Sequence, residues 1–150
     1  MPEHQKEPGH RIVAGVDGSP SSLAALRWAV RQAELTGTSV DAVMAWQSPA
    51  ASGLGWGAAM AGQTDYAELA AKTLDQAVSQ ATDPASPVKV RSMVGAGNAA
   101  QVLLDASADA DLLVVGSRGH GGFAGALLGS VSQHCTHHAH CPVVVIRGGG

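Results

Sequence analysis

The sequence predicts an α/β domain built on a parallel sheet. Short apolar runs alternate along it with longer segments of helical periodicity, and turns rich in glycine, serine and proline separate the two. The order is strand–helix four times over, closed by a last strand, which favours right-handed crossovers and helices on both faces of the sheet. A length of 150 residues suits one domain with a sizeable core.

The first strand and helix are clearly marked. Residues 11–17, RIVAGVD, form an apolar run that ends in a carboxylate, as expected of a buried strand before a turn. Ser19 is the expected N-cap of the following helix, and Pro20 its first residue. Gly37 is the expected C-terminal cap. Between them, five apolar residues have helical spacing: Leu23, Leu26, Ala29, Val30 and Ala33.

The middle of the chain continues the alternation. Residues 39–46 predict a second strand, and residues 47–62 a long loop, either a plain surface connection or a functional lid. An amphipathic helix is expected over 64–82, with Thr64 or Asp65 as its cap. Residues 88–94 alternate between apolar and polar, which indicates an edge strand.

The last third adds two helices and two strands. Helices are expected over 98–110 and 130–139, a central strand apolar on both faces over 111–117, and a last strand over 142–147. The domain is therefore expected to span 11–147, between flexible tails at 1–10 and 148–150.

Composition narrows the range of partners. The formal net charge is −3 and the basic residues are scattered, which argues against nucleic acid or a membrane surface as the main partner. No apolar run approaches the roughly 20 residues of a membrane span, and the polar start carries no signal-peptide core. We therefore expect a cytoplasmic protein in which Cys135 and Cys141 are free thiols.

Two glycine-rich segments follow predicted strands. Residues 95–100, GAGNAA, match the dinucleotide pattern G-x-G-x-x-[GA], which also requires an acidic residue about 20 positions further on. The next strand ends instead in VVGSR. A tight turn between strand and helix explains Gly95 and Gly97 as well, so an NAD site is the less favoured interpretation.

The second segment, residues 116–130, has the sequence GSRGHGGFAGALLGS. It lacks the Gly-Lys-[Ser/Thr] of a Walker loop but has the parts of an anion site. Its glycines allow backbone N–H groups to converge, and Arg118 adds a permanent charge. A helix predicted to begin near Ser130 offers further N–H donors. The residues that would form this site are Gly116, Gly119, Gly121, Gly122, Gly129, Ser130 and Ser132. The alternative is a flexible connection.

The spacing Gly116-x2-Gly119-x9-Gly129-Ser130 resembles the nucleotide-binding pattern of the universal stress protein family. RIVAGVDGSPSSLAALRWA, DLLVVGSRGHGG and HCPVVVIR are also similar to the first, fourth and last strand regions of that family, so the resemblance covers 11–147. It implies a Rossmann-like fold of the adenine nucleotide alpha hydrolase type, with an open five-stranded parallel sheet of order 3-2-1-4-5. Strands 1 and 4 are then neighbours, which puts Asp17 and Gly116 at one crevice.

The resemblance also implies a ligand and its contacts. ATP is the favoured ligand, possibly bound with Mg²⁺, and AMP or cyclic AMP is the alternative. Phosphate would lie against Gly119, Gly129 and Ser130, with Arg118 beside it. The base and ribose would be bordered by five residues: Asp17, Ala45, Val115, Gly116 and Val131.

We expect a nucleotide-sensing stress-response protein rather than an enzyme. The segment 116–130 contains no lysine and no carboxylate, and phosphoryl transfer usually needs a metal, a lysine and a group that orients the nucleophile. Asp17 alone could hold magnesium through water, and His120 could act as a base. Slow ATP hydrolysis and a purely structural or chaperone-like dimer are the alternatives. The apolar edge 143–146 and the family resemblance predict a homodimer.

Histidines and both cysteines gather in residues 132–142, SQHCTHHAHCP. His134 has His137 and His138 at i+3 and i+4, a spacing that can bind zinc. A helix end at which histidines suit the dipole explains the same pattern, and we expect no metal site.

Overall fold

The computed structural model describes residues 10–47, 66–117 and 129–147. Within these residues the predicted alternation is confirmed, and all five strands lie parallel in one sheet of order β3-β2-β1-β4-β5. The predicted edge position of β3 is confirmed as well. The strands are β1 (Arg11–Gly15), β2 (Ser39–Trp46), β3 (Val90–Ala96), β4 (Leu112–Gly116) and β5 (Val143–Ile146).

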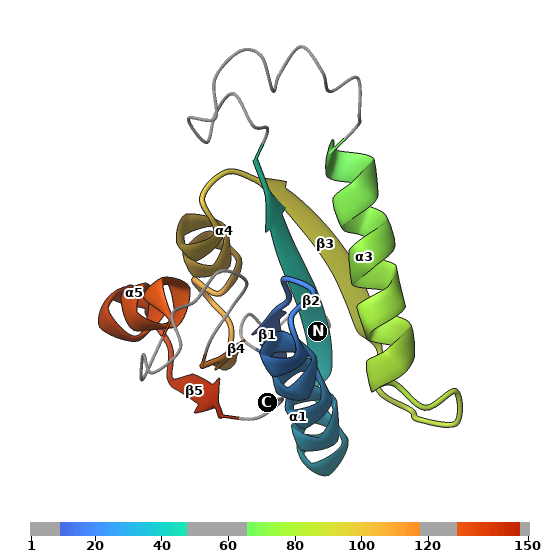
Figure 1. Cartoon of the computed structure of the whole chain (residues 1–150). Helices are drawn as coiled ribbons and strands as arrows, with labels where there is room; N and C mark the ends of the chain where they lie inside the picture. Colours follow the sequence, from blue (N-terminus) through green and yellow to red (C-terminus); the bar gives the residue numbers. More distant parts are fainter. Residues whose placement is uncertain (1–9, 48–65, 118–128, 148–150) are drawn as a thin grey trace, which may run out of the picture.

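Helices cover both faces of the sheet (Figure 1). They are α1 (Pro20–Thr36), α3 (Tyr66–Ala81), α4 (Ala99–Ala106) and α5 (Ser130–His138). Alternate strand residues face opposite ways and so build two apolar cores. One core joins Ala14 to Leu26 of α1 and Leu74 of α3. The other joins Val13 to Leu103 of α4 and to Cys135 of α5.

The caps of α1 are those predicted. The Ser19 side chain accepts a hydrogen bond from the Ser22 amide at 3.1 Å, and Pro20 is the first helical residue. Gly37 has a φ of 71°, and its N–H donates to the Ala33 carbonyl. Thr64 and Asp65 lie outside the described residues, so the cap of α3 stays a prediction.

Three predicted boundaries were wrong by two to four residues. The third strand covers Val90–Ala96 rather than 88–94, because it stays paired with β2 as far as Trp46. The following helix ends at Ala106 rather than residue 110; Ser107, with its N–H bonded to the Leu103 carbonyl, terminates it. The first strand ends at Gly15, two residues before Asp17.

An ion cluster lies around the buried Asp41 of β2, at the amino ends of the strands. Its Oδ2 lies 3.0 Å from Arg11 Nε and 3.1 Å from Arg91 Nη2. Arg11 also donates to the Ala106 carbonyl at 2.7 Å and pairs with Asp109 at 2.9 Å. A buried carboxylate is costly unless it is paired. The two guanidinium groups therefore tie together the amino ends of β1, β2 and β3.

None of the helices in the described part of the chain is both long enough and apolar enough to span a bilayer.

Candidate functional site

Strand register brings the predicted site residues to one edge of the sheet. Gly15 of β1 lies opposite Val43 of β2, and Ala14 lies opposite Val114 of β4. Parallel strands end at a common edge, and ligands of open α/β sheets bind beyond the carboxyl ends of the strands. Four predicted residues lie at or just beyond this edge: Asp17, Ala45, Val115 and Gly116.

Asp17 is held by the first turn of α1. Its Oδ1 accepts a hydrogen bond from the Ser19 amide at 2.9 Å, and its own amide donates to Ser22 Oγ at 3.1 Å. Ser22 and Ser19 are also hydrogen-bonded to each other, so hydrogen bonds join each pair among Asp17, Ser19 and Ser22. The carboxylate is thus fixed beside the positive end of the helix dipole, half-buried at the edge of the sheet.

Close packing against α1 requires a glycine at position 116. A Cβ built on it would lie 2.7 Å from the Ser21 carbonyl carbon and 2.8 Å from its oxygen. The missing side chain lets the first turn of α1 pack against the end of β4. Gly116 is the last residue of that strand, and its predicted place beside the ligand stays a prediction.

The start of α5 offers backbone donors without a side-chain cap. Gly129 is the N-cap and supplies no side-chain acceptor. Ser130 is exposed and Val131 is half-buried. An α-helix leaves its first N–H groups without intrahelical partners, and together with the dipole these donors favour an anion. Gly129 has an ordinary φ of −71°, so its backbone conformation does not itself require a glycine.

The hydroxyl of Ser132 is not available in the way the sequence suggested. Ser132 is buried, and its Oγ donates to the Gly129 carbonyl at 3.1 Å and to the Ser117 carbonyl at 3.4 Å. It therefore fastens the end of β4 to the start of α5. Its role is to hold the helix terminus in place rather than to contact a ligand.

Several predicted residues fall outside the described part of the chain. Arg118 and Gly119 lie there, as do His120, Gly121 and Gly122. Their assignment stays a prediction from the sequence pattern.

Arg147 is a basic residue near the same end of the sheet that the sequence pattern does not assign to the site. It follows β5, and the Ser117 amide donates to the carbonyl of the preceding Ile146 at 2.9 Å. This bond places the end of β5 beside Ser117, the residue that follows β4. Two features of the sequence could have placed Arg147 near the site. One is the implied strand order, which makes β5 a neighbour of β4, and the other is the position of this basic residue directly after the last apolar run.

The competing GAGNAA segment is explained by packing. Gly95 lies inside β3 rather than in a turn, and a Cβ there would lie 2.7 Å from Val102 Cγ1 of α4. Gly97 has a φ of 127°, which favours glycine, and its N–H donates to the Trp46 carbonyl at 2.9 Å. Contact with α4 at Gly95 and a positive φ at Gly97 account for both glycines without a ligand.

The histidine-rich end of α5 brings two imidazoles together. The ring centroids of His134 and His138 are 4.5 Å apart, and those of His137 and His138 are 6.4 Å apart. Among the described residues, no group of three or more His, Cys, Asp or Glu side chains is arranged to hold a metal ion.

The sheet order and the helix start at its carboxyl edge are those of a Rossmann-like α/β protein. The model of the universal stress protein family matches residues 9–147, and the chain belongs to that family. Universal stress protein Rv2623 of Mycobacterium tuberculosis is 39% identical over 145 residues, a match that covers 91% of this chain and 47% of the relative. This chain thus spans about half the length of the curated relatives it matches.

Solved structures share the fold. A universal stress protein in complex with cAMP has a TM-score of 0.64 and 24% identity, covering 93% of this chain and 98% of its own. The universal stress protein from Archaeoglobus fulgidus in complex with dAMP has a TM-score of 0.57 and 19% identity, with the same two coverages.

Proposed function

We propose that this chain binds an adenine nucleotide, preferably ATP, at the carboxyl edge of its sheet, and that it senses the nucleotide in a cytoplasmic stress response. The observation that carries the proposal is the uncapped start of α5 at the same sheet edge as the fixed Asp17 carboxylate. Two structures of the same fold hold cAMP and dAMP, which supports an adenine nucleotide as the ligand class.

Each part of the edge suits one part of a nucleotide. The N–H groups at the start of α5 would bind phosphate, together with the predicted contacts at Arg118 and Gly119. Asp17, fixed by Ser19 and Ser22, would accept hydrogen bonds from ribose or base. Apolar atoms of Ala45 and Val115 would border the sugar and the ring. AMP and cyclic AMP are the alternative ligands.

We propose sensing rather than efficient turnover. Residues 116–130 contain no lysine and no carboxylate, so the segment lacks the charged groups that usually orient the nucleophile and neutralise a transferring phosphoryl group. Slow ATP hydrolysis, with Asp17 holding Mg²⁺ through water, remains an outcome that a phosphate-release assay would detect.

We further propose that the protein works as a homodimer. β5 is an edge strand, and all four of its residues are only half-buried. An unpaired apolar edge is a template for another strand. Antiparallel pairing of Val143–Ile146 with a second copy across a two-fold axis would cover it.

Calorimetry with ATP, AMP, cyclic AMP and NAD tests the ligand. Gly119→Val should abolish nucleotide binding, because its side chain would fill the space that the phosphates need. Ser130→Ala should cost about 1 to 2 kcal/mol, the value of one hydrogen bond to a charged group. Ser79→Ala, the same change at an exposed site near the far end of α3, is the matched control.

Two results would contradict the proposal. If Gly119→Val binds ATP as tightly as the parent protein, the glycine segment is not the phosphate site. If NAD binds and adenine mononucleotides do not, the ligand class is wrong. Asp17→Ala should weaken AMP and ATP alike if the carboxylate serves the ribose or base, and should weaken magnesium-loaded ATP selectively if it serves the metal.

A further inference from the structure

The end of β5, which Arg147 follows, lies close to the start of α5 in the fold. The Ser117 amide donates to the Ile146 carbonyl, and the Ser117 carbonyl accepts a hydrogen bond from the Gly129 amide. Ser117 therefore bridges the end of β5 and the N-cap of α5. The end of β5 and the uncapped start of α5 are therefore both hydrogen-bonded to the same residue, Ser117.

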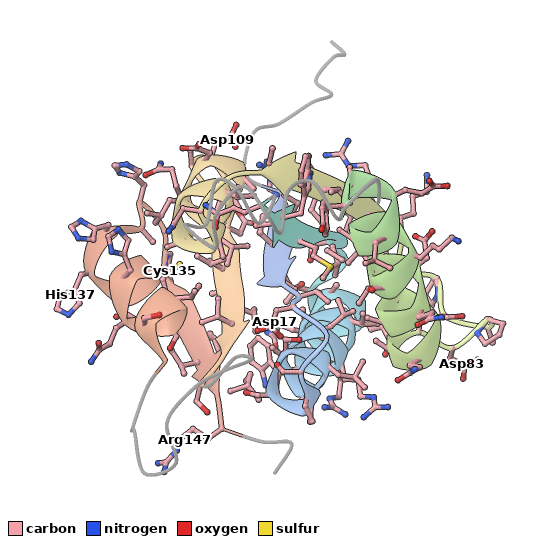
Figure 2. The ribbon with its side chains drawn as sticks, turned by 45° about the horizontal axis from the view of Figure 1, so that its top comes forward. Asp17, Asp83, Asp109, Cys135, His137 and Arg147 are labelled. Atoms are coloured by element: carbon pink, nitrogen blue, oxygen red, sulfur yellow. The ribbon has the colours of Figure 1, made fainter. Side chains whose placement is uncertain are left out.

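Strand alternation directs Arg147 to the face of the sheet on which α5 lies. Val143 and Val145 pack against the core shared with α4 and α5, whereas Val144 and Ile146 pack against the core of α1 and α3. Continuing this alternation by one residue puts Arg147 on the α5 side. Figure 2 shows its side chain at the end of β5, on the side of the molecule where α5 lies.

The charge of Arg147 is not neutralised within the described residues. Arg147 is exposed, and no ion pair or hydrogen bond of its side chain occurs in 10–47, 66–117 or 129–147. The intervening segment 118–128 contains no carboxylate in its sequence. Arg11 and Arg91 differ, because both pair with Asp41 at the opposite end of the sheet.

We propose that Arg147 binds the outer phosphates and makes this site prefer nucleotides with more than one phosphate. The proposal rests on the function proposed above. The N–H groups of α5 are fixed and would hold the phosphate nearest to them, whereas a long arginine side chain can reach a second anionic group beyond it. A guanidinium also donates in pairs to phosphate oxygens, so it adds binding that AMP and cyclic AMP cannot use fully.

Calorimetric titration of ATP and AMP into the parent protein and three variants tests this role. Arg147→Gln should weaken ATP about three- to tenfold and change AMP by less than about twofold. Arg147→Lys, which keeps the charge but loses the paired geometry, should fall between the parent and Arg147→Gln. Arg31→Gln is the matched control: it removes the same charge from an exposed position about 16 Å along α1 from its start and should leave both affinities unchanged.

The ratio of ATP to AMP affinity decides the outcome. An unchanged ratio in Arg147→Gln would overturn the role of Arg147, and so would an equal loss in Arg31→Gln, which would point to net charge alone. Both variants alter exposed side chains, and circular dichroism confirms their fold. If the parent protein binds neither nucleotide, the proposed function itself fails, a result that is distinct from an unchanged ratio.

Discussion

Replacing Gly116 with alanine should destabilise the protein more than the same replacement at Gly15 or Gly95, the other described glycines of its strands. The new Cβ would lie 2.7 Å from the Ser21 carbonyl carbon and 2.8 Å from its oxygen. Non-bonded carbon atoms prefer separations of about 3.5 to 4.0 Å, so the end of β4 and the start of α1 must move apart.

The start of α1 cannot move freely. Ser21 is buried, and its neighbours Ser19 and Ser22 are bonded to each other and to Asp17. Overpacking a close-packed site costs typically 1 to 3 kcal/mol, and we expect Gly116→Ala to fall near the top of that range, at about 2 to 3 kcal/mol. That is a large fraction of the 5 to 15 kcal/mol by which a domain is typically stable.

Two other glycines supply graded comparisons. A Cβ on Gly15 would lie 2.8 Å from Leu103 Cδ1, the end of a flexible side chain. A Cβ on Gly95 would lie 2.7 Å from Cγ1 of Val102, which is β-branched and stiff at χ1. The expected order of destabilisation is therefore Gly15→Ala, then Gly95→Ala, then Gly116→Ala, with the first at about 1 kcal/mol or less.

Urea denaturation followed by circular dichroism measures these differences. The midpoint should shift while the slope m stays constant, because the amount of surface exposed on unfolding is unchanged. The reasoning is refuted if Gly116→Ala is as stable as Gly15→Ala, since the carbonyl of Ser21 would then not constrain the end of β4.

Four other measurements test separate features. Val144→Lys should yield monomers in light scattering, and an intact dimer would place the interface elsewhere. A chelator should leave the melting temperature unchanged, whereas a fall would reveal a folding contribution from bound metal. A thiol reagent at neutral pH should label Cys141 before Cys135, because burial, with the neighbouring Cys141, raises the pKa of Cys135 to about 11; equal rates would contradict this. A hydrogen bond from Arg11 lowers the folded-state pKa of Asp109 below its ordinary 3.8, so the stability that this ion pair contributes is present above pH 3.8 and is lost as the pH falls further. Asp109→Asn should therefore make the free energy of unfolding depend less on pH in that range. An unchanged pH dependence would count against the Arg11–Asp109 pair.

Local signals in the sequence predicted the fold well because the chemistry that carries them is local. The helix α1 begins after Ser19, at Pro20, and ends before Gly37, as expected, since a cap acts within one turn of its own helix. The length of α4 was overestimated. Nothing in the composition of residues 107–110 opposes a helix, and the helix ends where Ser107 turns the chain toward β4.

The order of the strands came from the resemblance to a family rather than from periodicity. Periodicity identifies strands but not their neighbours, so Arg147 could not be placed near α5 from apolar pattern alone. The packing role of Gly116 and the hydrogen bonds of Ser132 could not be predicted from the sequence either. Their roles depend on contacts with Ser21 and Gly129, which only the folded chain brings about.

The ion cluster at Asp41 has a consequence for engineering the protein. It fastens three strands at the end of the sheet opposite the candidate site, through contacts among Arg11, Asp41, Arg91 and the Ala106 carbonyl. Residues 47–65 follow β2 and residues 117–129 follow β4, so both segments leave from the carboxyl ends of their strands. Grafting a foreign recognition segment into either connection would therefore leave this fastening intact, which makes the carboxyl edge the natural place to build new specificity and the amino edge the part to keep unchanged.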